Sequence, residues 1–173
     1  DPRPRTPLFL AVALLAALPA LAVDPVATLS RATVPAVGRQ EAIVTVSAFG
    51  RYAITAASAQ GTAVQLVDRM AGPGEVRGVA GEANGRLDAF LDRGEYQLVA
   101  LSHDKGKGEA KLAVTPFTEL SGARPPLLVE HKLVEATLDD VQQRSYWVHV
   151  ETRRTLAVEA GGRNLADLRV WQD

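Results

Sequence analysis

Alternation of apolar and polar residues is the dominant pattern in the first half of the chain. It begins after Glu41, where Val44, Val46 and Ala48 share one face, and Gly50 ends it. An alternation of period two over four to eight residues, bounded by glycine or polar turns, is typical of a half-buried β-strand. The pattern recurs along the chain, and we predict strands over residues 43–49, 52–56, 63–67, 86–91, 96–102 and 109–115.

The connections between these strands are rich in glycine and polar residues. Residues 71–85 contain five glycines, a density that breaks any helix. Residues 103–108 are polar and glycine-rich, as expected of a hairpin connection. Because no helical stripe occurs between residues 41 and 117, we predict an all-β fold. The expected architecture is an antiparallel β-sandwich, either a jelly roll or immunoglobulin-like.

One local motif predicts how this sandwich is closed. Residues 92–98 read Asp-Arg-Gly-Glu-Tyr-Gln-Leu, with the spacing D-x-G-x-Y-x-hydrophobe. In immunoglobulin-type sandwiches, a tyrosine at such a corner hydrogen-bonds back to the upstream backbone and pins the crossing between the sheets. In the alternative, the segment is a simple hairpin and Tyr96 is only an aromatic residue on a strand.

Strand patterns resume after a linker rich in proline and glycine, at residues 127–129, 133–138, 146–150, 156–160 and 165–170. We expect a second β module that is incomplete, because its last alternation runs to the end of the sequence. Residues 51–54 and 145–148, at an offset of 94, both begin such patterns with Tyr52 and Tyr146, which raises the hypothesis of a duplicated module. The predicted organisation is a signal peptide (1–22), an extended lead-in with at most a short strand at 26–29 (23–40), a β-sandwich module (41–117), a linker (118–126) and a second β module (127–173).

The N-terminal residues carry the three parts of a secretory signal. Arg3 and Arg5 precede an apolar run over 8–18, Pro19 ends that run, and Ala20-Leu21-Ala22 follows as an A-x-A cleavage site. A transmembrane helix needs about 20 apolar residues, and this run has about half that number. We therefore expect export to a bacterial periplasm or the cell exterior, with no membrane span after the signal is removed.

Composition agrees with an exported bacterial protein that needs no disulfides. The sequence contains no cysteine, and arginine outnumbers lysine by 15 to 4, as in GC-rich bacterial genes. Removal of residues 1–22 leaves 151 residues, enough to bury about 68–70% of the unfolded surface. It also removes Asp1, Arg3 and Arg5, so 17 basic and 19 acidic side chains remain. This net charge of about −2 does not attract nucleic acid, which we exclude as a partner.

Two groups of residues could form a metal or acid–base site. Asp88 and Asp92 lie four residues apart on one face of a predicted strand and could bind calcium or act as an acid–base pair. The simpler interpretation is a solvated strand end. His103, His131 and His149 are far apart in the sequence, and a zinc site needs three or four ligands. We predict no metal site and no cofactor.

Other familiar motifs are missing or have simpler explanations. No serine stands in a G-x-S-x-G elbow, and the glycines at 72–74 and 106–108 lack the spacing of a phosphate-binding loop. Trp147 and Trp171 could form a platform for sugars if exposed, although an aromatic residue beside alternating valines more often packs in a core or edge. We predict no catalytic residues and a protein that is not an enzyme.

Two stretches of the sequence resemble a known kind of module. One runs from Gly50-Arg51-Tyr52-Ala53-Ile54-Thr55 through residues 60–68 to residues 85–88 and 94–96, and the other covers residues 143–147 and 159–168. Both resemble bacterial pre-peptidase C-terminal domains, which are β-sandwiches. A signal peptide followed by such modules is similar to the N-terminal region of bacterial alpha-2-macroglobulin-like proteins. This resemblance implies a parent protein that traps proteases at the cell envelope, in many members through a C-x-E-Q thioester. The sequence lacks cysteine, so that site would lie elsewhere.

The expected function is that of a non-catalytic structural or binding module of a large secreted envelope protein. Its expected partners are other domains of the same longer chain, and possible partners are proteases or envelope proteins. Two alternatives stay open: an accessory domain of a secreted hydrolase, and a carbohydrate-binding module that uses Trp147 or Trp171.

Overall fold

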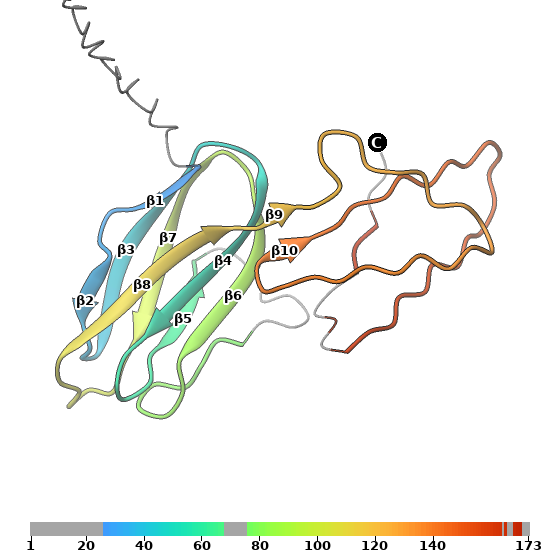
Figure 1. Ribbon diagram of the computed structural model, residues 1–173. Helices are drawn as coiled ribbons and strands as arrows, with labels where there is room; N and C mark the ends of the chain where they lie inside the picture. Colours follow the sequence, from blue (N-terminus) through green and yellow to red (C-terminus); the bar gives the residue numbers. More distant parts are fainter. Residues whose placement is uncertain (1–25, 68–75, 164, 166–167, 171–173) are drawn as a thin grey trace, which may run out of the picture.

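Two four-stranded antiparallel sheets face each other in the computed structural model, which describes residues 26–67, 76–163, 165 and 168–170 (Figure 1). Sheet A has the strand order β1-β3-β7-β5, and sheet B has the order β2-β8-β4-β6. A short parallel pair, β9 and β10, lies outside the two sheets. The strands are β1 (Ala27–Leu29), β2 (Thr33–Pro35), β3 (Arg39–Val46), β4 (Gly50–Ala57), β5 (Ala63–Leu66), β6 (Gly85–Leu91), β7 (Gly94–Leu101), β8 (Glu109–Pro116), β9 (Thr118–Glu119) and β10 (Gln142–Gln143).

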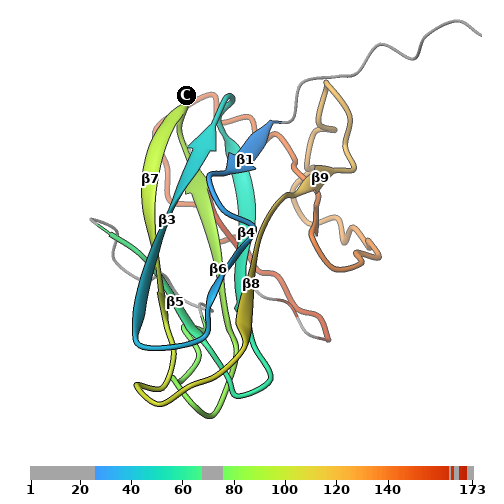
Figure 2. The same cartoon turned by 90° about the vertical axis from the view of Figure 1, so that its left-hand side faces the viewer.

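The core lies between the inner faces of the sheets, which Figure 2 shows as two layers. In β3, Ala42, Val44 and Val46 are buried and the residues between them are exposed. The other long strands supply further buried residues in the same alternating way. The predicted all-β sandwich is confirmed. The largest side chains with almost no exposed surface include Tyr52, Ile54, Leu91, Leu98, Val44, Val46 and Val64.

The strand order of the sandwich is nested. Among the described strands of the sandwich, consecutive strands never pair, and each connection crosses from one sheet to the other. The pairs β4·β6, β3·β7 and β2·β8 are nested around β5, so the chain folds back along its own path. An immunoglobulin sandwich instead pairs consecutive strands within a sheet. The nested order therefore favours the jelly-roll alternative.

The predicted hairpin at residues 103–108 was wrong, because this loop joins β7 in sheet A to β8 in sheet B. It packs against the turn before β3. The amide of Ala36 donates a hydrogen bond of 2.9 Å to the Gly108 carbonyl, and the Ser102 amide donates one of 2.9 Å to the Gly38 carbonyl. A side chain at Gly106 would overlap the carbonyl of Ala36. Glycine is therefore required where two backbones meet.

The six predicted strands correspond to β3–β8, with ends that differ by a few residues. β1 and β2 lie in the segment predicted as an extended lead-in, so the sandwich begins before residue 41. β1 pairs with β3, and β2 pairs with β8. Each has three residues, which is too short for alternation to be distinctive.

Tyr96 forms the predicted corner. Its hydroxyl donates a hydrogen bond of 3.0 Å to the carbonyl of Asp92, four residues upstream, where the chain passes from β6 in sheet B to β7 in sheet A. The hairpin alternative is therefore wrong. Tyr52 forms a second corner, in which its hydroxyl donates to the carbonyl of Ala48 at 2.7 Å where the chain passes from β3 to β4. In both corners a glycine stands two residues before the tyrosine.

After β8 the chain forms little regular structure in the part that the structure describes. β10 pairs with β9, and Leu127 forms an isolated bridge with Trp147. The strands predicted at 133–138, 146–150 and 156–160 do not form, and the last alternation, at 165–170, is only partly described. Their apolar residues stay exposed, as at Leu133 (85%) and Val150 (42%), because no neighbouring strand pairs with them. The boundaries of the second module and its relation to the first stay predictions.

Candidate functional site

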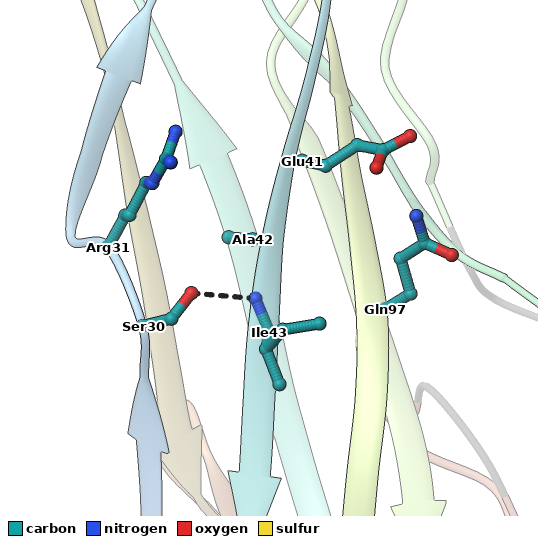
Figure 3. Close-up of a pocket in the computed structure, with 6 residues that line it drawn as sticks. All are labelled: Ser30, Arg31, Glu41, Ala42, Ile43 and Gln97. Carbon is teal, nitrogen blue, oxygen red and sulfur yellow. Dashed lines mark hydrogen bonds between the residues drawn. The ribbon is translucent and has the colours of Figure 1, made fainter.

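A shallow depression of about 240 Å³ lies on the outer face of sheet A (Figure 3). It forms where the chain leaves sheet A after β1 and enters sheet B at β2, which opens a gap beside β3. Its lining residues are Ser30 and Arg31 from this crossing, Glu41, Ala42 and Ile43 from β3, and Gln97 from β7.

Ser30 holds the edge of the depression in place. Its hydroxyl accepts a hydrogen bond of 2.8 Å from the Ile43 amide, and its own amide donates to the Ile43 carbonyl at 2.9 Å. Arg31 then extends along one side, while Glu41 and Gln97 point away from it on the other side. Glu41 pairs with Arg39 at 3.0 Å. The depression offers charge and hydrogen-bonding groups to a polar segment, with no pair of groups aligned for proton transfer among the residues that line it.

The outer face of sheet B carries a denser set of contacts around Arg86. Its Nε lies 2.8 Å from the Asp88 carboxylate on the same strand, and its Nη1 lies 2.8 Å from the carboxylate of Asp140, 54 residues away. The hydrogen bond with Asp88 is the main cause that raises the pKa of Arg86, and Arg86 in turn lowers the pKa of Asp140. Arg86 thus joins β6 to the segment after β9.

Glu119 on β9 makes a second set of contacts, with the segment that contains β10. Its carboxylate accepts hydrogen bonds from the amides of Ser121 (2.8 Å) and Ser145 (3.1 Å), from the Ser145 hydroxyl (2.7 Å) and from the Gln143 side chain (3.3 Å). Partial burial alone would raise the pKa of Glu119, but the hydrogen bonds from Ser145 and Ser121 outweigh it and lower the pKa. The charged carboxylate therefore joins the two sides of the β9–β10 pair.

Aromatic and arginine side chains gather on the outer face of sheet B near the corners. The rings of Phe49 and Phe90 stack with centroids 6.0 Å apart. The Arg51 guanidinium lies 4.4 Å from the ring centre of Phe117 and 5.8 Å from that of Phe90. Arg169, near the end of the chain, lies 5.0 Å from the Phe90 ring. These distances are those of cation–π contacts.

The two carboxylates predicted from the sequence have separate roles. Asp88 is engaged by Arg86, whereas Asp92 lies after β6 and its main-chain carbonyl accepts the hydrogen bond from Tyr96. His103 is also occupied locally, because its Nδ1 accepts a hydrogen bond from the Lys105 amide. In the described part of the chain, no group of three or more His, Asp or Glu side chains could hold a metal ion.

Among the remaining candidate residues, Trp147 is more exposed than expected. Trp147 is 52% exposed, although packing in a core or edge was expected. Its main chain is hydrogen-bonded to the segment at residues 126–128: the Trp147 amide donates to the Pro126 carbonyl, and the Leu128 amide donates to the Trp147 carbonyl. His131 and His149 are exposed in the same segment. Trp171, the glycines at 72–74 and the signal-like residues 1–22 lie outside the described residues.

Sequence reasoning missed Arg86, Glu119 and Asp140. Apart from the near neighbours Asp88, Ser121 and Val141, their partners lie 24 to 54 positions away, and no local motif marks such pairs. Tyr52 could have been found, because the spacing from Ala48 to Tyr52 repeats the spacing from Asp92 to Tyr96 with a glycine at the same place.

No helix long and apolar enough to cross a membrane occurs among the described residues. Comparison with protein-family models, curated proteins and solved structures finds no match for this chain.

Proposed function

We propose that this chain is a non-catalytic structural or binding module from the N-terminal region of a larger secreted envelope protein. The observation that carries the proposal is the joint around Glu119. Four hydrogen bonds to one carboxylate, from Ser121, Gln143 and Ser145, fasten β9, which directly follows the last strand of the sandwich, to the segment that contains β10. Charge-assisted hydrogen bonds are stronger than neutral ones, so the joint sets the direction in which the chain leaves the sandwich. Such a joint suits a scaffold that positions the next module.

The proposed parent is an alpha-2-macroglobulin-like protein that traps proteases. The jelly-roll order and the two tyrosine corners are compatible with the β-sandwich modules that the sequence resembles. In this role the outer faces of the sheets contact neighbouring modules or the captured protease. The open reading frame beyond Asp173 tests this identity. Further sandwich modules with a thioester or bait segment support it, whereas a protease or glycosidase signature identifies an accessory domain of a hydrolase.

Export is tested with a reporter enzyme that is active only after secretion. Fusion of residues 1–40 to alkaline phosphatase should give active enzyme, and cleavage after Ala22 should appear by N-terminal sequencing. The matched control is Leu14→Arg, which interrupts the apolar run and should abolish export. An active Leu14→Arg fusion, or an inactive parent fusion, contradicts a secretory signal.

The binding role is tested by mixing the purified chain with a panel of secreted proteases. We expect a complex on size-exclusion chromatography and no turnover of ester, glycoside or peptide substrates by the chain itself. Turnover that persists through purification and follows the chain through two columns contradicts the non-catalytic proposal.

The exposure of Trp147 favours carbohydrate binding as a second candidate. An exposed indole can stack on a sugar ring, and Trp147 is more than half exposed. Soluble peptidoglycan fragments should then quench tryptophan fluorescence in the parent and in Trp171→Phe, but not in Trp147→Phe. Equal quenching in both variants, or none in the parent, removes this candidate.

A further inference from the structure

Val141 adopts a backbone conformation that its side chain disfavours. Its φ is +51°, and Val141 and His131 are the non-glycine residues with positive φ in the described part of the chain. Positive φ is uncommon for any residue with a side chain and is a genuine outlier for a β-branched one. Such strain persists only where the surrounding contacts impose it.

The contacts around Val141 act from both sides. On the N-terminal side, the Asp140 carboxylate pairs with Arg86 on β6 and accepts a hydrogen bond of 2.9 Å from the Val141 amide. On the C-terminal side, the Val141 carbonyl accepts a hydrogen bond of 2.9 Å from the Thr118 amide, where β10 begins to pair with β9. Val141 is therefore held between an ion pair to the sandwich and a parallel strand pair.

We propose that residues 139–145 form a strained latch that holds the segment after β9 on sheet B and opens as one unit when Asp140 leaves Arg86. In the closed state the ion pair and the β9–β10 pairing hold Val141 in its left-handed conformation. In the open state Val141 relaxes, the β9–β10 pairing is lost and the outer face of β6 is uncovered.

Two features weaken the closed state and oppose the hydrogen bonds from Gln143 and Ser145 to Glu119 that stabilise it. The Asp140 side chain is 74% exposed, and water and salt weaken an ion pair of this kind. Strain at Val141 opposes the same closed state. The sandwich does not share in the opening, because Asp88 keeps Arg86 in place from the same strand. A ligand that competes for Arg86 therefore shifts the latch toward its open state. The latch does not depend on the proposed secreted role.

Amide hydrogen exchange of the full chain, followed by NMR at neutral pH and low salt, measures this opening. The reporters are the amides of Thr118 and Leu120, which donate to the carbonyls of Val141 and Gln143. Asp140→Asn removes the charge and keeps an acceptor for the Val141 amide. We expect both reporters to exchange about two- to fivefold faster, while the amides of β3 and β7 keep their rates. Asp139→Asn is the matched control, since it removes the neighbouring carboxylate, which makes no ion pair with Arg86, and should leave the reporters nearly unchanged.

Relief of strain should act in the opposite direction. Val141→Gly and Val141→Asn place residues that tolerate positive φ at this position, and both should slow exchange of the two reporters by about fivefold or more. The latch is overturned if neither variant slows exchange or if Asp140→Asn leaves the reporters unchanged. It is also overturned if Asp139→Asn acts as strongly as Asp140→Asn, or if the β3 and β7 amides accelerate equally, because the event is then not specific to the ion pair or not local.

Discussion

At the scale of single residues, two tyrosine hydroxyls stabilise the crossings between the sheets. Tyr52 is almost fully buried and Tyr96 partly so, and each donates to a carbonyl four residues upstream. Burial raises the pKa of Tyr52, and the electrostatic influence of Tyr96 adds to this effect. The two corners lie at one end of the sandwich, since Val46 at the end of β3 pairs with Gly94 at the start of β7.

Removal of either hydroxyl should lower the free energy of unfolding. A net hydrogen bond is worth about 0.5–1.5 kcal/mol, and we expect Tyr96→Phe to lose an amount in this range. Tyr52→Phe should lose more, because the hydrogen bond of Tyr52 is partly buried whereas that of Tyr96 is exposed. Urea unfolding measures both losses. Tyr146→Phe, outside the sandwich, is the control. An unchanged free energy of unfolding in Tyr96→Phe would show that the Tyr96 hydrogen bond does not stabilise the fold.

Gly106 is a position at which the close approach of another backbone leaves no room for a side chain. A Cβ there would meet the Ala36 carbonyl, so Gly106→Ala should destabilise the sandwich by about 1–3 kcal/mol. Gly161→Ala is the control, because no atom of the described structure lies within 4 Å of a Cβ at that position. Thermal unfolding of both variants tests the difference, and equal midpoints would show that the loop moves aside without cost.

At the scale of elements, the β9–β10 pair depends on the charge of Glu119. The folded pKa of this carboxyl lies below its ordinary value of 4.5. The stabilisation is therefore fully present above pH 4.5 and is lost as the pH falls through the lower folded pKa.

Exchange of the Ser145 amide should therefore accelerate below pH 4.5, beyond the intrinsic effect of pH, while the amides of β3 and β7 change less. Glu119→Gln should exchange faster at neutral pH and lack this additional acid dependence. An acid dependence that is the same in Glu119→Gln would place the titrating group elsewhere.

At the scale of the whole molecule, the buried core is confined to the sandwich. The residues of the core cluster lie between Val34 and Leu112, whereas many apolar residues after 120 stay exposed. Stability is lowest where few apolar contacts are buried, so the segment after β9 should open before the sandwich does.

Brief digestion with trypsin should show this order. We expect the first cuts after Lys132, Arg144 and Arg153, followed by a longer-lived fragment that contains β1–β8. Lys105 and Lys107 lie in a loop that is tied to Ala36 and Gly38, so cuts there should come later. Mass spectrometry of a time course identifies the order, and early cleavage at Lys105 or Lys107 would contradict it.

The pattern of the sequence by itself determined the class of fold and most of its strands. Alternation at Val44–Val46 or Leu87–Leu91 predicts a strand because the requirement to bury one face is local. The corner at Tyr96 was predictable for the same reason, since its donor and acceptor lie four residues apart.

Only the tertiary structure decided which strands pair and which polar residues meet. Nothing in the local pattern distinguishes a jelly roll from an immunoglobulin-like order, because both use the same alternating strands and differ in their long-range pairing. The contacts of Arg86 with Asp140 and of Glu119 with Ser145 are also long-range, so the local pattern does not predict them. These contacts depend on where the chain returns after β8, and that path is set by the packing of the whole molecule.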